Sequence, residues 1–136
     1  MIVVDSSIWV SRMVPQDAFH SASRRWIANA VSGGETLVIP SLALAETAGA
    51  VARRTGYAVV GRQTARWILR IPGLRVDPVD RAVAMVAARL AADLMLRGPD
   101  AVFVALAYRL GVPLITWDSE QANRASPLVT TLQPQV

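Results

Sequence analysis

Two acidic residues end apolar runs that the sequence predicts to be buried strands. Asp5 follows Met1-Ile2-Val3-Val4, and Asp118 follows Leu114-Ile115-Thr116-Trp117. Short, continuous apolar runs are typical of parallel strands that are covered on both faces. Ligands of open α/β sheets bind outside the carboxyl ends of such strands. We therefore expect both carboxylates at the edge of the sheet where a ligand would bind.

Two further acids are predicted near the starts of helices. Asp100 is the second residue after Gly98, and apolar residues follow it at three, four and seven positions, so it lies on the inward side of its helix. Glu46 lies about one turn into another helix, with alanine or glycine three and four positions away. Those small neighbours leave room for a pocket. We expect these two acids to join the two at the strand ends.

The chemistry that four convergent carboxylates favour is metal-assisted hydrolysis. They repel one another, the sequence places no basic residue beside them, and such clusters persist when a divalent cation neutralises them. Oxygen ligands, without cysteine or a pair of histidines, predict Mg²⁺ or Mn²⁺. One or two such ions lower the pKa of a bound water and bind phosphate oxygens, which favours in-line hydrolysis of a phosphodiester.

Each acid also has a purely structural alternative. Asp5 can begin an Asx turn, and Asp118 can cap the last helix. Asp100 can interact with the dipole of its helix, and Glu46 can pair with Arg53 or Arg54 on the surface. At each position taken singly, the sequence leaves this alternative open.

The predicted elements that position these acids alternate between short strands and helices. Strands are predicted for residues 2–5, 37–39, 74–76, 114–117 and 128–132. Helices are predicted for residues 8–10, 17–31, 40–54, 58–71, 80–97 and 99–111. Crossovers that contain a helix are long enough for parallel pairing. The sequence therefore predicts one α/β domain over residues 1–136, with a parallel sheet of about four or five strands flanked by helices on both faces.

The charge balance favours an anionic partner. The 14 basic residues are all arginine, and the net charge is +4. Without the four acids described above, 14 arginines face six acids, a net charge of +8. Arginine binds phosphate bidentately and stacks on bases, so an acidic centre in a basic field suits a nuclease. A general bias towards arginine is the alternative, and the row Arg62, Arg66 and Arg70 suits either an anionic partner or a solvated helix face.

The composition also excludes several classes of site. Cysteine is absent, which excludes disulfides and cysteine-based zinc sites and is compatible with a reducing cytoplasm. Charged residues interrupt the apolar stretches at 82–96 and 101–110, and no basic region precedes an apolar stretch at the N-terminus. We therefore expect a cytoplasmic protein without a signal peptide or a membrane span.

Four short motifs carry a resemblance that spans nearly the whole chain. They are Val3-Val4-Asp5-Ser6-Ser7, Pro40-Ser41-Leu42-Ala43-Leu44-Ala45-Glu46, Asp100-Ala101-Val102-Phe103-Val104-Ala105-Leu106-Ala107 and Leu114-Ile115-Thr116-Trp117-Asp118. In this order they resemble the PIN domain family, and most of all the VapC toxins of bacterial toxin–antitoxin pairs. Residues 12–35 and 56–97 match no motif of that family, and we expect them to determine the choice of substrate.

The resemblance implies a Mg²⁺-dependent or Mn²⁺-dependent endoribonuclease. It also implies an RNA substrate, a homodimer and a tight complex with an antitoxin protein. The residues that it assigns to the acidic, metal-binding cluster are Asp5, Glu46, Asp100 and Asp118, with Ser7 and Thr116 at polar positions that support the cluster.

Other function classes fit less well. An aspartyl phosphatase also begins with a strand that ends in Asp, but it needs a second acid two residues later, where this chain has Ser7. A response-regulator receiver needs a lysine near its end, and this chain has none. The lone His20 lacks a partner motif, so we interpret it as a packed or surface residue rather than a general base. A catalytically inactive PIN module that binds RNA is the second hypothesis.

Overall fold

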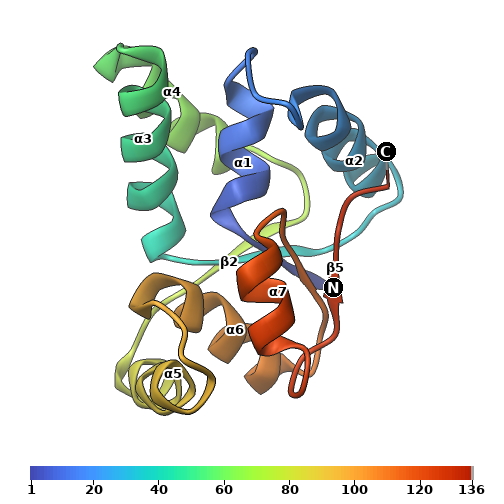
Figure 1. Cartoon of the computed structure of the whole chain (residues 1–136). Coiled ribbons are helices and arrows are strands. Elements are labelled where there is room, and N and C mark those ends of the chain that lie inside the picture. The colour runs from blue at the N-terminus through green and yellow to red at the C-terminus, as the bar shows by residue number, and fades with distance from the viewer. Residues whose placement is uncertain (136) are drawn as a thin grey trace.

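A five-stranded sheet forms the centre of the molecule, and all neighbouring strands pair in parallel (Figure 1). The computed structural model describes residues 1–135. The strands, in the spatial order β3-β2-β1-β4-β5, are β1 (Ile2–Val4), β2 (Leu37–Pro40), β3 (Leu74–Asp77), β4 (Leu114–Ile115) and β5 (Thr131–Leu132). The predicted parallel α/β sheet is confirmed, although its last two strands are shorter than predicted.

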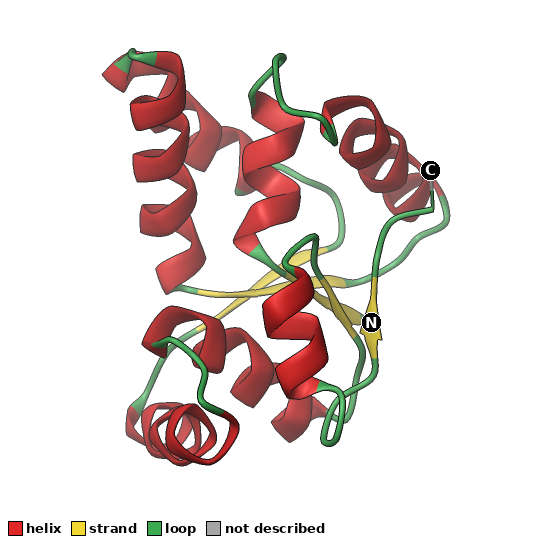
Figure 2. Cartoon of the chain, viewed as in Figure 1, coloured by secondary structure: helices red, strands yellow, loops and turns green. Residues whose placement is uncertain are grey.

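Seven helices within residues 1–135 cover both faces of the sheet. They are α1 (Ser6–Met13), α2 (His20–Ser32), α3 (Leu42–Thr55), α4 (Ala58–Ile68), α5 (Arg81–Leu94), α6 (Gly98–Leu110) and α7 (Ser119–Ala125). Helices α1 to α4 lie on one side of the sheet and α5 to α7 on the other (Figures 1 and 2). Connections between parallel strands are right-handed, so crossovers that run in opposite directions across the sheet place their helices on opposite faces. The chain moves from β1 through β2 to β3 and then returns past β1 to β4 and β5, which explains the division.

The three adjacent strands β2, β1 and β4 are buried along their whole length. Helices cover both of their faces, so every side chain must be apolar, and the residues of β1 are accordingly Ile2, Val3 and Val4. Trp9 of α1 is fully buried in the same core. The apolar runs in the sequence therefore specify which strands lie at the centre.

The reversal of strand order lies between β1 and β4. From β1 the chain proceeds to β2 and β3 on one side, whereas β4 and β5 lie on the other side. In open α/β sheets this switch point, at the carboxyl ends of the strands, is where ligands bind. Asp5 directly follows β1, and Asp118 follows β4 after two intervening residues. The topology therefore brings both strand-end acids to the expected ligand site.

Several predicted helix boundaries are wrong, among them the end of α4 at Ile68 rather than at residue 71, and two of them have clear local reasons. Helix α2 begins at His20 rather than at residue 17, because the side chain of Asp17 accepts a hydrogen bond of 2.8 Å from the backbone N–H of Phe19 and forms a turn. Helix α5 ends at Leu94 rather than at residue 97, because the next residue takes a left-handed conformation with a φ of 56°. Neither change moves the predicted acids away from the sheet edge.

Candidate active site

Asp5 is held in one orientation at the carboxyl end of β1. As the N-cap of α1, its Oδ2 accepts a hydrogen bond of 3.0 Å from the backbone N–H of Ser7. The same oxygen accepts a bond of 3.1 Å from Oγ1 of Thr116, and Oδ1 accepts one of 3.4 Å from Nε2 of Gln121. Only 6% of the residue is exposed. The capping role that the sequence left open is present, and it orients the carboxylate.

The end of β4 is bound to the end of β1. Oγ1 of Thr116 accepts a hydrogen bond of 2.9 Å from the backbone N–H of Asp118. Oγ of Ser7 accepts one of 3.0 Å from the backbone N–H of Trp117, and it lies 3.4 Å from Oγ1 of Thr116. Asp118 is exposed and caps α7 with its side chain. Ser7 and Thr116 therefore hold the two strand ends together.

Asp100 interacts with the strand-end acids from the first turn of α6. Its pKa is raised from the ordinary value of 3.8 to about 6. Burial of the half-buried carboxyl group is the largest cause, followed by the negative charges of Asp5 and Asp118, while Arg97 opposes the shift. Asp5 and Asp118 are therefore close enough to Asp100 for their charges to destabilise its ionised form.

Glu46 approaches Asp5 and Asp100 from α3, which lies on the side of the sheet opposite to α6. Burial raises its pKa, a hydrogen bond of 3.0 Å from Oγ of Ser6 lowers it, and the charges of Asp5 and Asp100 raise it further. The net shift is upward. Arg54, one of its two expected partners, pairs instead with an aspartate that precedes α2. The structure thus brings Glu46 near Asp5 and Asp100, while Asp118 lies near Asp100.

Gln121 is a residue of this site that the sequence analysis missed. It is 1% exposed, and its Nε2 donates to Oδ1 of Asp5 at 3.4 Å and to the backbone carbonyl of Asp100 at 3.3 Å. The side chain therefore joins the end of β1 to the start of α6. Its residue type carries no signal, and the one clue in the sequence is its position one helical turn after Asp118.

A comparison with protein-family models identifies the fold. Residues 2–126 match the model described as the PIN domain. The chain belongs to the PIN domain family. The match spans all four acids as well as Ser7 and Thr116, and it confirms the resemblance that the sequence motifs suggested. No curated protein matches the sequence of this PIN domain.

Solved structures share this fold at low sequence identity. The VapC20 protein of Mycobacterium tuberculosis, described as a sarcin–ricin loop cleaving toxin, superposes with a TM-score of 0.75 at 21% identity, over 90% of this chain and 94% of that one. VapBC2 from Rickettsia felis, bound to a DNA fragment of its promoter, gives a TM-score of 0.73 at 16% identity, over 99% of this chain and 100% of that one. A toxin–antitoxin complex from Klebsiella pneumoniae gives a TM-score of 0.72 at 15% identity, over 99% of this chain and 98% of that one.

The side chains at this site carry the oxygen atoms that a hard divalent cation such as Mg²⁺ prefers as ligands. The acids and Gln121 present oxygen atoms, and the side-chain oxygen of Gln121 is buried without a hydrogen-bond partner in the structure. A pocket of about 150 Å³ is lined by Asp100, Asp118 and Gln121, among others. Within residues 1–135, however, no three His, Cys, Asp or Glu side chains lie close enough to hold one ion. The acidic side chains therefore do not form a complete coordination site for one ion in this structure.

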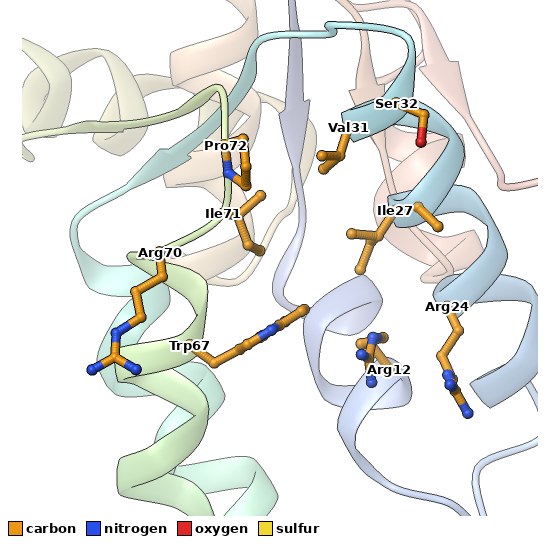
Figure 3. Close-up of a pocket in the computed structure, with 10 residues that line it drawn as sticks. Arg12, Arg24, Ile27, Val31, Ser32, Trp67, Arg70, Ile71 and Pro72 are labelled. Carbon is orange, nitrogen blue, oxygen red and sulfur yellow. The ribbon is translucent and has the colours of Figure 1, made fainter.

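A second cavity, of about 360 Å³, lies between α1, α2 and α4 (Figure 3). Arg12 lies there between Trp67 and Arg24, with its guanidinium carbon 4.7 Å from the centre of the Trp67 ring, whereas Arg70 points outward. Burial and the neighbouring Arg24 lower the pKa of Arg12. No carboxylate lines this cavity, so it belongs to the basic surface of the PIN domain and not to the acidic cluster.

None of the helices in residues 1–135 is both long and apolar enough to cross a lipid bilayer.

Proposed function

We propose that this PIN domain is a metal-dependent endoribonuclease and the toxin of a toxin–antitoxin pair. The observation that supports the proposal is that the carboxylate of Asp100 lies near those of Asp5, Glu46 and Asp118 beside the switch point of the sheet. Burial and mutual repulsion raise the pKa of Asp100 there to about 6. A fold gains no stability from such an arrangement in the absence of a cation, and a functional site is the usual reason for it.

The proposed ligands of the Mg²⁺ or Mn²⁺ ion are Asp5, Glu46, Asp100 and Asp118, whose side chains would have to draw closer together than in the structure to hold one ion. When bound, the ion would neutralise their charge and acidify a water for attack on the phosphodiester. The chain supplies orientation: Ser7, Thr116 and Gln121 fix the carboxylate of Asp5 through three hydrogen bonds. The raised pKa values of Asp100 and Glu46 mean that these two groups hold a proton more readily than ordinary acids until a cation replaces it.

The proposed substrate is RNA, which the charge distribution of the chain supports. The net charge outside the four acids is +8, and the row Arg62, Arg66 and Arg70 is exposed, with the first two on α4 and Arg70 in the turn after it. A basic surface attracts the phosphate backbone of RNA, and a cation in the acidic cluster would reduce the repulsion between its carboxylates and the phosphate. The similar VapC20 protein is described as a toxin that cleaves the sarcin–ricin loop, which supports structured RNA as the substrate.

The proposed partner is an antitoxin protein, and the proposed assembly contains a homodimer of this chain. The support for the antitoxin is the similarity to a structure described as a toxin–antitoxin complex. An antitoxin would inhibit by covering the acidic cluster. Expression of this chain alone in bacteria is therefore expected to arrest growth, and co-expression with its antitoxin is expected to restore it.

A catalytically inactive PIN module that binds RNA is the second candidate. The observation that favours it is that the acids of residues 1–135 do not form a closed site for an ion. Such a module would be harmless when expressed alone and would bind RNA without cleaving it. The retention of all four acids favours the nuclease.

Metal-dependent cleavage of structured RNA by the purified protein tests the proposed function. We expect cleavage with Mg²⁺ or Mn²⁺ and none with EDTA. Asp5→Asn and Asp100→Asn should each lower the rate by at least about a hundredfold, since even indirect contacts to a metal contribute roughly 10–100-fold. Asp93→Asn is the matched control, because Asp93 is an exposed acid on α5. Wild-type activity in Asp5→Asn or Asp100→Asn would refute the assignment.

A further inference from the structure

A groove of about 430 Å³ leads away from the acidic cluster on the side of α1. Its lining extends from Asp118 past Ser6 and Ser7 to Phe19, Trp117 and Arg54. Asp118 belongs to the acidic cluster, Ser6 donates to Glu46, and Ser7 donates its backbone N–H to Asp5. The groove is therefore continuous with the proposed active site, and a chain cleaved there would extend into it.

Two stacked aromatic rings form one wall of the groove. The rings of Phe19 and Trp117 lie 3.9 Å apart between centroids and 7° from parallel. One face of the Phe19 ring is covered by Trp117, yet Phe19 is 41% exposed. An exposed, immobilised aromatic ring is a platform on which a nucleobase can stack, because every base has a π face.

Trp117 is fixed from two sides. Its Nε1 donates a hydrogen bond of 2.8 Å to Oγ of the buried Ser23, and its backbone N–H donates one of 3.0 Å to Oγ of Ser7. The residue that follows it is Asp118. The rigid end of β4 therefore connects the aromatic platform directly to the acidic cluster.

Phe19 is fixed by an ion pair with α3. Its backbone N–H donates a hydrogen bond of 2.8 Å to Oδ1 of Asp17, and Nη1 of Arg54 lies 2.6 Å from Oδ2 of the same carboxylate. The pair neutralises Asp17 within the groove, and the Arg54 side chain is still 44% exposed. The remaining N–H groups of its guanidinium are available to a phosphate.

We propose that this groove binds the nucleotide next to the cleaved phosphodiester of the RNA, with its base stacked on Phe19 and its phosphate near Arg54. The inference rests on the proposed ribonuclease function and names the residues that position its substrate. A single-stranded or flipped-out nucleotide is required, because a base inside a duplex has no free face.

Binding measured in EDTA tests the groove without cleavage. We expect Phe19→Leu, which keeps the apolar contact with Trp117 but lacks a π face, to weaken binding of a labelled single-stranded RNA roughly 5–150-fold, the contribution of one base–aromatic stack. Phe19→Tyr should retain the wild-type affinity. Tyr57→Ala is the control, because Tyr57 is 66% exposed and lies outside the groove. Wild-type affinity in Phe19→Leu would overturn the proposal.

Steady-state kinetics separate a failure of the groove from a failure of the proposed function. With metal present, Phe19→Leu should raise KM and leave kcat at saturating RNA within about twofold, since stacking binds substrate and transition state alike. If the wild-type protein cleaves RNA and Phe19→Leu shows an unchanged KM, the groove assignment is overturned and the ribonuclease stands. If the wild-type protein cleaves no RNA, the ribonuclease fails, and the comparison in EDTA still decides whether the groove binds RNA.

Discussion

Thr116 donates a hydrogen bond of 3.1 Å to Oδ2 of Asp5, across the boundary between the two central strands of the sheet. The same hydroxyl oxygen accepts the backbone N–H of Asp118. One buried side chain thus fixes the positions of two acids that lie far apart in the sequence. The arrangement makes specific predictions about stability and activity.

Thr116→Val removes this hydroxyl group and keeps the shape of the side chain. We expect the free energy of unfolding to fall by about 1–3 kcal/mol, because the backbone N–H of Asp118 loses its partner. Cleavage should fall roughly 10–100-fold, since the carboxylate of Asp5 loses one of its orienting donors. Urea denaturation and RNA cleavage measure the two effects. Thr130→Val, at an exposed position, should change neither, and equal behaviour of the two variants would refute the role of Thr116.

Gln121→Glu replaces the amide that donates to Asp5 with a carboxylate. The new charge would be buried beside other negative charges, so we expect the metal-free protein to lose roughly 3 kcal/mol of stability at pH 7. Mg²⁺ should restore more stability to this variant than to the wild type. Thermal melting in EDTA and in Mg²⁺ measures both effects. Gln63→Glu, on the exposed face of α4, is the control, and an equal loss in both variants would contradict the account.

Asp100→Asn should change the pH dependence of stability. The wild-type carboxyl group has a pKa of about 6 when folded, against an ordinary value of 3.8, so the folded protein binds the proton more tightly. The stability of the wild type relative to the variant therefore falls as pH rises from about 4 to about 6, and it stays low above pH 6.

In EDTA, Asp100→Asn is therefore expected to be more stable than the wild type at pH 7 and equally stable near pH 4. The shift corresponds to about 3 kcal/mol, but the group is half-buried and screened by solvent, so we expect about 1 kcal/mol. Urea denaturation at both pH values, with Asp93→Asn as the control, measures it. A difference between wild type and Asp100→Asn that did not vary with pH would contradict the raised pKa.

The fold and the positions of the four acids could be predicted from the sequence because their signals are local. A continuous apolar run predicts a strand covered on both faces, and the residue that ends it lies at the ligand edge of a parallel sheet. Asp5 and Asp118 follow directly from this argument. Their metal-binding role stays a prediction.

Other parts of the site could not be predicted because they depend on contacts between distant residues. Gln121 has a residue type without a chemical signature, and its importance comes from its packing between Asp5 and Asp100. The stacking of Phe19 on Trp117 joins a turn before α2 to the end of β4. That turn was itself predicted as helix, because the hydrogen bond that Asp17 accepts is not visible in the hydrophobic periodicity.

The central claim is that the four carboxylates bind one divalent cation or a pair of them, and the metal-induced shift in melting temperature tests it most directly. A hundredfold excess of Mn²⁺ over its Kd should stabilise the wild type by about 2.7 kcal/mol. Asp100→Asn should melt above the wild type in EDTA, because repulsion within the cluster is relieved, and gain less than about half as much from Mn²⁺. Equal metal-induced shifts in the two proteins would contradict the claim.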